Sequence, residues 1–168
     1  MKKIIVSAFV LLSTLTFAQD GFKPRPVPVV DVKTLDGKTV STSTFTNDGK
    51  PYILDFWATW CKPCVNELNA IKDVYADWQK ETGVKVIAVS VDDARTATNI
   101  KPFVNGKGWE YEIYSDANGD LKRALNIGMV PYVFLVDGKG QIVSMKTGYA
   151  PGDEEELYKE VKALLKTN

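Results

Sequence analysis

The sequence predicts an α/β protein in which helices cover both faces of a mixed β-sheet. Strand-like apolar runs alternate with runs that have helical spacing. A hairpin and then a helix close the chain, and a hairpin adds antiparallel pairs to strands that are otherwise connected through helices. The 168 residues, 45% of them apolar and 25% charged, suit one folded domain and are too few for two of ordinary size.

The first 18 residues have the features of a signal peptide. Lys2 and Lys3 precede an apolar run at 4–17, and small residues lead up to a cleavage site after Ala18. The run is 14 residues long, whereas a membrane-spanning helix needs about 20. We therefore expect a signal peptide at 1–18, export to the periplasm or beyond the cell, and a single domain at 19–168.

The charge of the mature chain excludes two classes of partner. Removal of two lysines leaves 21 − 2 = 19 basic side chains against 21 acidic ones, a net charge of about −2. Nucleic acids and anionic membranes attract basic surfaces, so neither is expected as a partner. No cysteine lies near the cleavage site, which argues against a lipid anchor, and we expect a soluble monomer.

The first predicted elements are a hairpin and a central strand. Asp36-Gly37 is a tight-turn signal between two short strand-like runs. The run after Pro51 is apolar or aromatic almost throughout, which is typical of a strand buried on both faces, and only Asp55 interrupts it. In order, we predict an extended stretch at 22–28, strands at 29–35 and 38–41, a polar loop at 42–50 and the central strand at 52–58.

A long helix is predicted to begin at Cys61 and to end near Gly83. Proline is well tolerated in a first turn, which suits Pro63, and glycine commonly ends a helix. Residues recurring at helical spacing form its apolar side: Val65, Leu68, Ile71, Val74, Tyr75 and Trp78.

The second half of the chain continues the alternation. Pro102 predicts either a kink or the true start of its helix, and Asp116 or Asn118 is expected to cap the next one. The predicted elements are a strand at 84–91, a helix at 96–107, a strand at 109–114, a helix at 116–127, a hairpin of strands at 132–136 and 142–147, and a helix from 153 with Leu157, Val161, Leu164 and Leu165 on one face.

Cys61 and Cys64 are the only cysteines in the chain. As a structural staple the pair would be weak, because closing a four-residue ring stabilises by roughly 1.9 kcal/mol, against about 3 kcal/mol for a 15-residue loop. Redox chemistry explains the spacing better, and the helix start would stabilise a thiolate at Cys61. Cys61 would then attack a partner disulfide, and Cys64 would resolve the mixed disulfide.

Metal and haem sites lack the residues they need. A four-ligand zinc site would require further cysteines or histidines, and the chain has no histidine. Covalent haem attachment requires histidine where Val65 stands. We therefore expect neither a metal nor another cofactor.

The segment from Asp55 to Cys64, Asp-Phe-Trp-Ala-Thr-Trp-Cys-Lys-Pro-Cys, resembles the active-site segment of thioredoxins. Further similarities, at 35–40, Glu67, Val130-Pro131 and 137–140, point to the exported TlpA/ResA-like reductase branch of that superfamily, which is associated with cytochrome c maturation. The resemblance covers residues 26–167. It implies the thioredoxin fold with an N-terminal hairpin and a helix and strand inserted between about Arg95 and Asp116.

The resemblance also implies roles for five residues around the cysteines. Asp55 matches the buried acid that takes the proton of the resolving cysteine, the alternative being a strand-end charge without a catalytic task. Glu67 matches an acid near the cysteines of the TlpA/ResA-like branch, the alternative being a solvated helix residue. Pro131 matches a cis-proline that leaves the backbone of Val130 open to pair with substrate, the alternative being a trans turn proline, and Trp60 would form an apolar docking rim.

Two departures from thioredoxins affect the expected electrostatics. Ala88 falls near the position of the buried lysine that partners the aspartate in many thioredoxins, so Asp55 should be harder to ionise. Lys62 replaces the usual glycine between the cysteines and adds an exposed positive charge.

The other three tryptophans, unlike Trp60, are assigned to the core: Trp57, Trp78 and Trp109.

These observations predict a periplasmic protein-disulfide reductase. It would take electrons from a membrane donor of the thiol-reductase type and pass them to oxidised substrate proteins. The alternatives are a peroxiredoxin-type peroxidase, for which Thr59 and the distant Pro51 have the wrong spacing, a copper-delivery module, which normally adds a histidine, and a binding or chaperone module that does not need the cysteines.

Overall fold

The computed structural model describes residues 22–167, so the predicted signal peptide lies outside the described residues. Within that range, one mixed sheet has the strand order β1-β8-β7-β4-β5-β6-β2-β3. Its elements are β1 (Arg25–Pro26), β2 (Asp31–Thr34), β3 (Thr39–Ser41), η1 (Thr42–Thr44), β4 (Tyr52–Trp57), α1 (Lys62–Thr82), β5 (Lys85–Ser90), η2 (Ala97–Asn99), α2 (Ile100–Lys107), β6 (Glu112–Ser115), α3 (Asp120–Ala124), β7 (Tyr132–Val136), β8 (Gln141–Thr147) and α4 (Asp153–Thr167).

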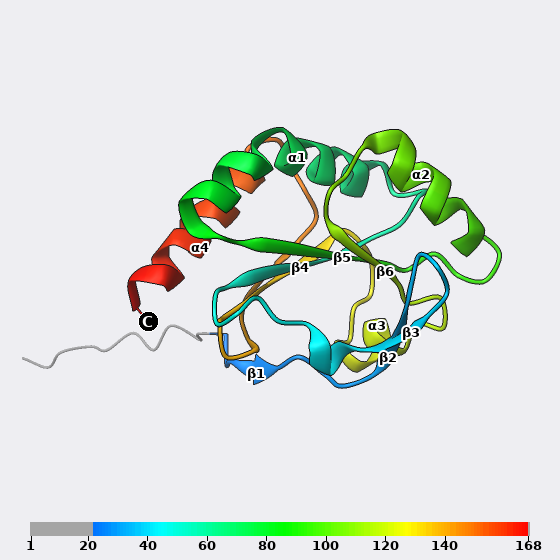
Figure 1. Cartoon of the computed structure of the whole chain (residues 1–168), viewed down its shortest axis with the longest axis horizontal. Coiled ribbons are helices and arrows are strands. Elements are labelled where there is room, and N and C mark those ends of the chain that lie inside the picture. Colours follow the sequence, from blue (N-terminus) through cyan, green and yellow to red (C-terminus); the bar gives the residue numbers. More distant parts are fainter. Residues whose placement is uncertain (1–21, 168) are drawn as a thin grey trace, which may run out of the picture.

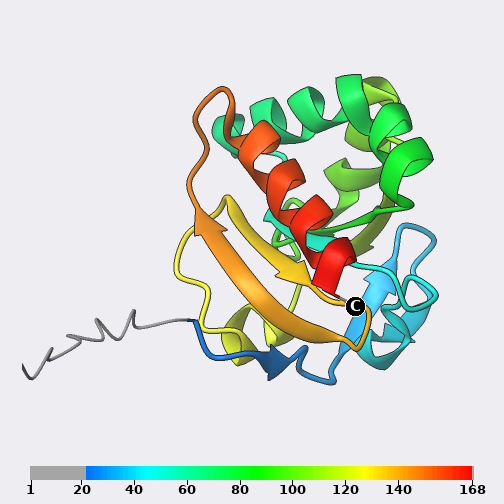
Figure 2. The ribbon, with the colours of Figure 1, turned by 90° about the vertical axis from the view of Figure 1, so that its left-hand side faces the viewer.

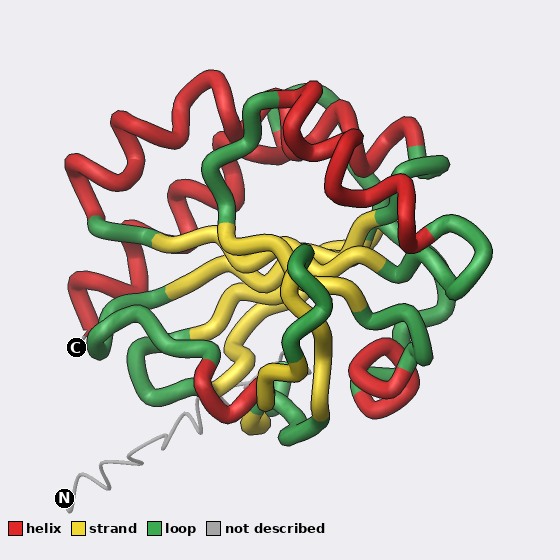
Figure 3. Tube along the Cα trace, turned by 45° about the vertical axis from the view of Figure 1, so that its right-hand side comes forward, coloured by secondary structure: helices red, strands yellow, loops and turns green. Residues whose placement is uncertain are grey.

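Helices cover both faces of the sheet, as predicted, but unequally. α1, α2 and α4 lie over one face, and the short α3 lies on the other (Figure 1). A view from the side shows α1 and α4 packed next to each other (Figure 2). The tube in Figure 3 shows the strands as one layer between these helices and α3.

β4 is the central strand, and all six of its residues are buried, as its apolar sequence predicts. It pairs in parallel with β5 and antiparallel with β7. The C-terminal ends of β4 and β5 and the N-terminal end of β7 therefore lie at the same edge of the sheet. The loops that follow or precede these three strands meet at that edge.

The structure corrects the predicted strand at 109–114. The strand β6 begins only at Glu112, because Trp109 and Tyr111 are buried in the core and are hydrogen-bonded to residues of α1. The Trp109 indole donates to the side-chain oxygen of Asn69 at 3.0 Å, and the Tyr111 hydroxyl donates to the carbonyl of Leu68 at 2.7 Å.

The helix predicted at 116–127 is also shorter than expected. Its N-cap is Gly119, in the left-handed region at φ 70°, rather than Asp116 or Asn118. Asp116 still serves the helix start, because its carboxylate accepts hydrogen bonds from the backbone N–H groups of Leu121 and Lys122. Gly119, with its positive φ, stands between Asp116 and the first helical residue, so Asp116 lies outside the helix that its carboxylate caps.

In the longer helices the structure decides between two alternatives at Pro102 and corrects the prediction for Val74. In the helix predicted at 96–107, Pro102 stands in the first turn of α2, after η2, so it marks the true start rather than a kink. In α1, Val74 is partly exposed although it has the spacing of the apolar face.

Aromatic side chains hold the layers together. Trp57, Trp78 and Trp109 are buried, as predicted. The Trp57 ring meets the Trp109 ring edge-on at 5.0 Å between centroids, and the Trp78 ring stacks on Tyr158 of α4 at 4.5 Å. Such pairs join the sheet, α1 and α4 into one core.

Among residues 22–167, no helix combines the length and the apolar character that crossing a membrane requires.

Candidate active site

The turn between β4 and α1 places Cys61 at the start of the helix. Cys61 is the N-cap, with φ −90° and ψ 95°, so it stands one residue before the helix rather than within it as predicted. Its N–H donates to the carbonyl of Ala58 at 3.1 Å, which closes the turn, and Pro63 occupies the first helical turn. The sulfur of Cys61 accepts the N–H of Cys64 at 3.3 Å, and it therefore lies at the positive end of the helix dipole.

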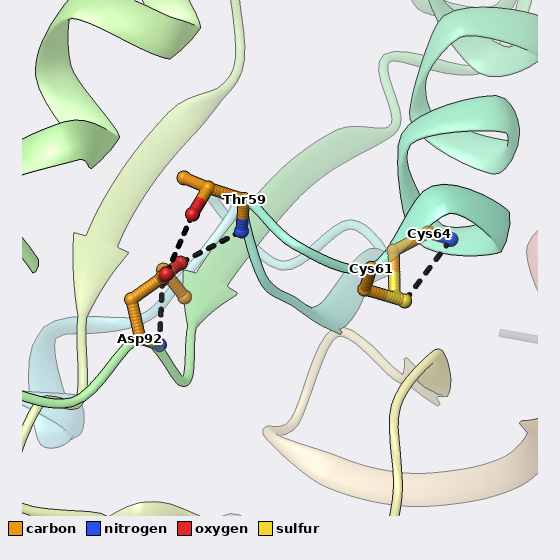
Figure 4. Close-up of a disulfide and its surroundings, with 5 residues drawn as sticks. Thr59, Cys61, Cys64 and Asp92 are labelled. Atoms are coloured by element: carbon orange, nitrogen blue, oxygen red, sulfur yellow. Dashed lines mark hydrogen bonds between the residues drawn. A yellow bond between two sulfur atoms is a disulfide. The ribbon is translucent and has the colours of Figure 1, made fainter. Parts of the chain in front are cut away.

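The two cysteines form a disulfide with a Cα–Cα distance of 5.3 Å (Figure 4). Cys61 keeps 5% of its surface exposed, whereas Cys64 is fully buried. Trp60, directly before Cys61, is 62% exposed, and Lys62 directly after it is exposed too. An incoming sulfur can therefore approach Cys61 more easily than Cys64.

Asp55 lies on β4 and is fully buried. Its neighbours across the sheet are Ala88 on β5 and Val133 on β7, so neither adjacent strand supplies a cation beside it. Neither of its carboxyl oxygens has a hydrogen-bond partner among the described residues. Burial raises the pKa of Asp55 far above the ordinary range.

Glu67 projects from α1 one turn after Cys64 and is also buried, in contrast to the solvated alternative. Its Oε2 has no hydrogen-bond partner within residues 22–167. Burial raises the pKa of Glu67, and the nearby carboxyl of Asp55 raises it further. Asp153 and Glu154 at the start of α4 act in the same direction, and Lys146 opposes them.

The loop before β7 completes this edge of the sheet. The Val130–Pro131 peptide bond is cis, as the resemblance predicts. Phe56 on β4 pairs with Tyr132 on β7, which puts this loop at the same end of the sheet as the Cys61 turn. The side chain of Val130 is largely buried, whereas Met129 is 80% exposed.

Asp92 and Met129 are two residues that sequence reasoning missed. Asp92 is fully buried just after β5 and accepts hydrogen bonds from the backbone N–H and the hydroxyl of Thr59 at 2.8 and 2.6 Å (Figure 4). An acid after a strand looks like an ordinary loop residue, and an apolar residue in a loop looks like core. Only the position of Asp92 at the carboxyl end of a strand adjoining β4 could have pointed to it.

No group of three or more potential metal-binding His, Cys, Asp or Glu side chains occurs in the described part of the chain. The arrangement of residues instead brings together the Cys61–Cys64 disulfide, two buried acids that form no salt bridge among the described residues, and exposed apolar side chains at Trp60 and Met129.

The sequence of this chain is similar to those of known proteins. Residues 24–145 match the AhpC/TSA family. Two curated relatives are both named thiol-disulfide oxidoreductase ResA. The one from Oceanobacillus iheyensis is 34% identical, covering 74% of this chain and 62% of the relative. The one from Bacillus thuringiensis is 31% identical, covering 80% of this chain and 75% of the relative.

A solved structure shows the same fold. The uncharacterized thioredoxin-like protein from Porphyromonas gingivalis superimposes with a TM-score of 0.75 and is 54% identical, covering 83% of this chain and 92% of that one. The chain thus aligns with nearly all of this structure, but with less than two thirds of the Oceanobacillus relative's length.

Proposed function

This chain belongs to the AhpC/TSA family, in the ResA-like group of thiol-disulfide oxidoreductases, and we propose that it is a protein-disulfide reductase that acts outside the cytoplasm. The observation that carries this proposal is the Cys61–Cys64 disulfide at the start of α1, in which Cys61 is 5% exposed and Cys64 is fully buried. That asymmetry separates an attacking cysteine from a resolving one.

The reaction moves two electrons to the client. In the reduced protein, the Cys61 thiolate attacks one sulfur of a client disulfide, and the other client sulfur leaves as a thiolate. Cys64 then loses its proton and attacks the sulfur of Cys61, which releases the second client sulfur. The client leaves as a dithiol, and the protein is left with the Cys61–Cys64 disulfide. A membrane thiol donor reduces it again.

Asp55 and Glu67 are proposed to manage the proton of Cys64. A general acid or base works best when its pKa lies near the working pH, and burial raises both carboxyl pKa values from the ordinary range in that direction. The two acids interact, so they titrate as a pair, and one proton can be shared between them. In this role the pair accepts the proton when Cys64 attacks and returns it when the disulfide opens.

Clients are proposed to dock on the apolar rim formed by Trp60, Met129, Val130 and Pro131. The exposed side chains of Trp60 and Met129 supply the apolar area, and both belong to segments at the disulfide end of the sheet. The backbone of Val130 would pair with an extended client segment.

The setting of the reaction is part of the same proposal. The signal peptide at 1–18 would direct the domain at 19–168 to the periplasm, where it would work as a monomer without a cofactor. Its electron donor would be a membrane protein of the thiol-reductase type.

A peroxidase is less well supported. The Thr59 hydroxyl, which a peroxidase would direct at peroxide, already donates to Asp92. Pro51 is also remote from Cys61 in sequence.

A trapping experiment tests the proposal. Cys64→Ser in the native host should accumulate mixed disulfides through Cys61, and the matched Cys61→Ser variant should accumulate none. The wild type should reduce insulin and should have a potential of about −200 to −280 mV, whereas a value of about −120 mV would mark it as an oxidant. Insulin reduction that survives Cys64→Ala would overturn the two-cysteine mechanism.

A further inference from the structure

Asp92 makes a cluster of hydrogen bonds that the reaction described above does not use. Its carboxylate accepts three hydrogen bonds: from the Ser90 hydroxyl at 2.7 Å, the Thr59 N–H at 2.8 Å and the Thr59 hydroxyl at 2.6 Å. Its own N–H donates to the Ser90 hydroxyl at 3.0 Å. A buried carboxylate is costly unless it is hydrogen-bonded, and two of the three bonds that satisfy this one come from Thr59.

Thr59 is held by its two hydrogen bonds to Asp92, and it belongs to the turn that carries Cys61. It precedes the exposed Trp60 and stands two residues before Cys61. The turn closes through the Cys61 N–H to the Ala58 carbonyl. Asp92 therefore ties the end of β5 to the segment that holds both the attacking sulfur and the docking tryptophan (Figure 4).

The importance of this tie changes with the redox state. In the oxidised protein, the covalent bond to Cys64 also holds Cys61 at the helix start. When that bond opens, the position of the Cys61 sulfur depends on the backbone that leads to it, and Thr59 anchors that backbone. Hydrogen bonds to a carboxylate are among the stronger ones in proteins, and Thr59 makes two.

We propose that Asp92 is a positioning residue that acts through Thr59 and stabilises the reduced form more than the oxidised form, by keeping the Cys61 sulfur at the N-terminus of α1. The proposal rests on the thiol-disulfide exchange proposed above. It assigns the chain a third buried acid with a task separate from that of Asp55 and Glu67, because Asp92 contacts the turn and not the resolving cysteine.

The equilibrium with glutathione measures this difference directly. Oxidised protein and two glutathione molecules give reduced protein and one glutathione disulfide, so any stability change shared by both forms cancels. Thr59→Val keeps the side-chain shape but removes the hydroxyl donor to Asp92. We expect the equilibrium constant to move at least threefold toward the oxidised protein, and the pH profile of Cys61 alkylation by iodoacetamide to move to higher pH. Thr59→Ser should restore both.

A distant threonine provides the matched control. Thr42 is buried, and its hydroxyl donates to the Pro28 carbonyl at 2.6 Å and accepts the Val30 N–H at 2.9 Å. Thr42→Val should lower the melting temperature without moving the glutathione equilibrium. Asp92→Asn keeps the size of the side chain and should act in the same direction as Thr59→Val, and the double variant should show less than the sum of the two effects.

The proposal is overturned if Thr59→Val and Asp92→Asn lower the melting temperature but leave both the equilibrium constant and the alkylation profile of the wild type. The reductase proposal is decided separately by insulin reduction with the wild type. A wild type that equilibrates with glutathione but does not reduce insulin would contradict the reductase proposal and would leave the Asp92 test valid.

Discussion

At the scale of single residues, Asp55 and Glu67 make the stability of the oxidised protein depend on pH. Their charged forms are disfavoured in the fold, chiefly by burial, so their folded-state pKa values lie above the value of about 4 expected in the unfolded chain. Between those two values the folded state binds more protons than the unfolded state. The stability that the neutral acids permit is fully present at low pH and decreases as pH rises from about 4 toward the raised folded values.

Asp55→Asn should flatten this pH dependence. Each such acid contributes a slope of up to about 1.4 kcal/mol per pH unit to the free energy of unfolding, and asparagine cannot ionise. In urea unfolding of the oxidised protein at pH 5 and pH 8, the wild type should lose more stability than the variant over this interval. Glu67→Gln should act in the same direction, because it removes both its own ionisation and its repulsion of Asp55.

An exposed acid provides the control for this measurement. Glu155→Gln, on the solvent side of α4, should leave the pH profile of the wild type unchanged. Parallel profiles for Asp55→Asn and the wild type would contradict the assignment of Asp55 as the buried acid with a raised pKa.

At the scale of elements, sequence patterns located what local chemistry determines. The run at 52–58 became β4, the turn at Asp36-Gly37 formed its hairpin, and Gly83 ended α1. Periodicity failed where tertiary contacts decide. Trp109 and Tyr111 alternate like strand residues, yet hydrogen bonds to α1 hold them outside β6.

The candidate site divides in the same way. The spacing of the cysteines predicted their redox role, and the resemblance to a known family predicted the buried Asp55 and the cis peptide bond at Pro131. The sequence could not predict the contact of Asp92, because that contact depends on the parallel pairing of β4 with β5. This pairing brings Asp92, which follows β5, beside the turn that follows β4. Met129 was missed because exposure of an apolar loop residue is a property of the folded surface.

The end of α1 allows a prediction about Gly83. Its φ of 68° lies in the left-handed region, which disfavours residues that have a Cβ atom. An added Cβ would also lie 2.6 Å from the Lys50 ammonium, a flexible group that can move away. Gly83→Ala should therefore lower the free energy of unfolding by about 1 kcal/mol, measured by urea denaturation.

Gly106 provides the same substitution in the opposite context. It lies within α2, outside the left-handed region, and nothing lies within 4 Å of an added Cβ. Gly106→Ala should stabilise the protein by up to about 1 kcal/mol, because alanine is the better helix former. Equal effects of the two substitutions would show that the backbone conformation of Gly83 does not determine the result.

At the scale of the whole molecule, the topology gathers the proposed reaction at one edge of the sheet. The carboxyl ends of β4 and β5 carry the Cys61 turn and Asp92, and the antiparallel β7 brings the Val130–Pro131 loop to the same edge. The opposite end of α1 has a purely structural contact, the stack of Trp78 on Tyr158. Trp78 lies 17 residues after Cys61, about 25 Å along the helix axis.

This separation predicts that replacing tryptophan by alanine affects stability at one end of α1 and client docking at the other. Trp78→Ala removes a buried ring between α1 and α4 and should lower the free energy of unfolding by about 3–5 kcal/mol, while the variant that remains folded at low temperature keeps its insulin kinetics. Trp60→Ala removes an exposed ring and should change stability by less than about 0.5 kcal/mol. It should nevertheless reduce kcat/KM for insulin about tenfold, mainly through KM, since tryptophan is a frequent anchor of protein interfaces. Unchanged insulin kinetics in Trp60→Ala would contradict the docking rim, because no other described side chain next to Cys61 in sequence offers a comparable exposed apolar area.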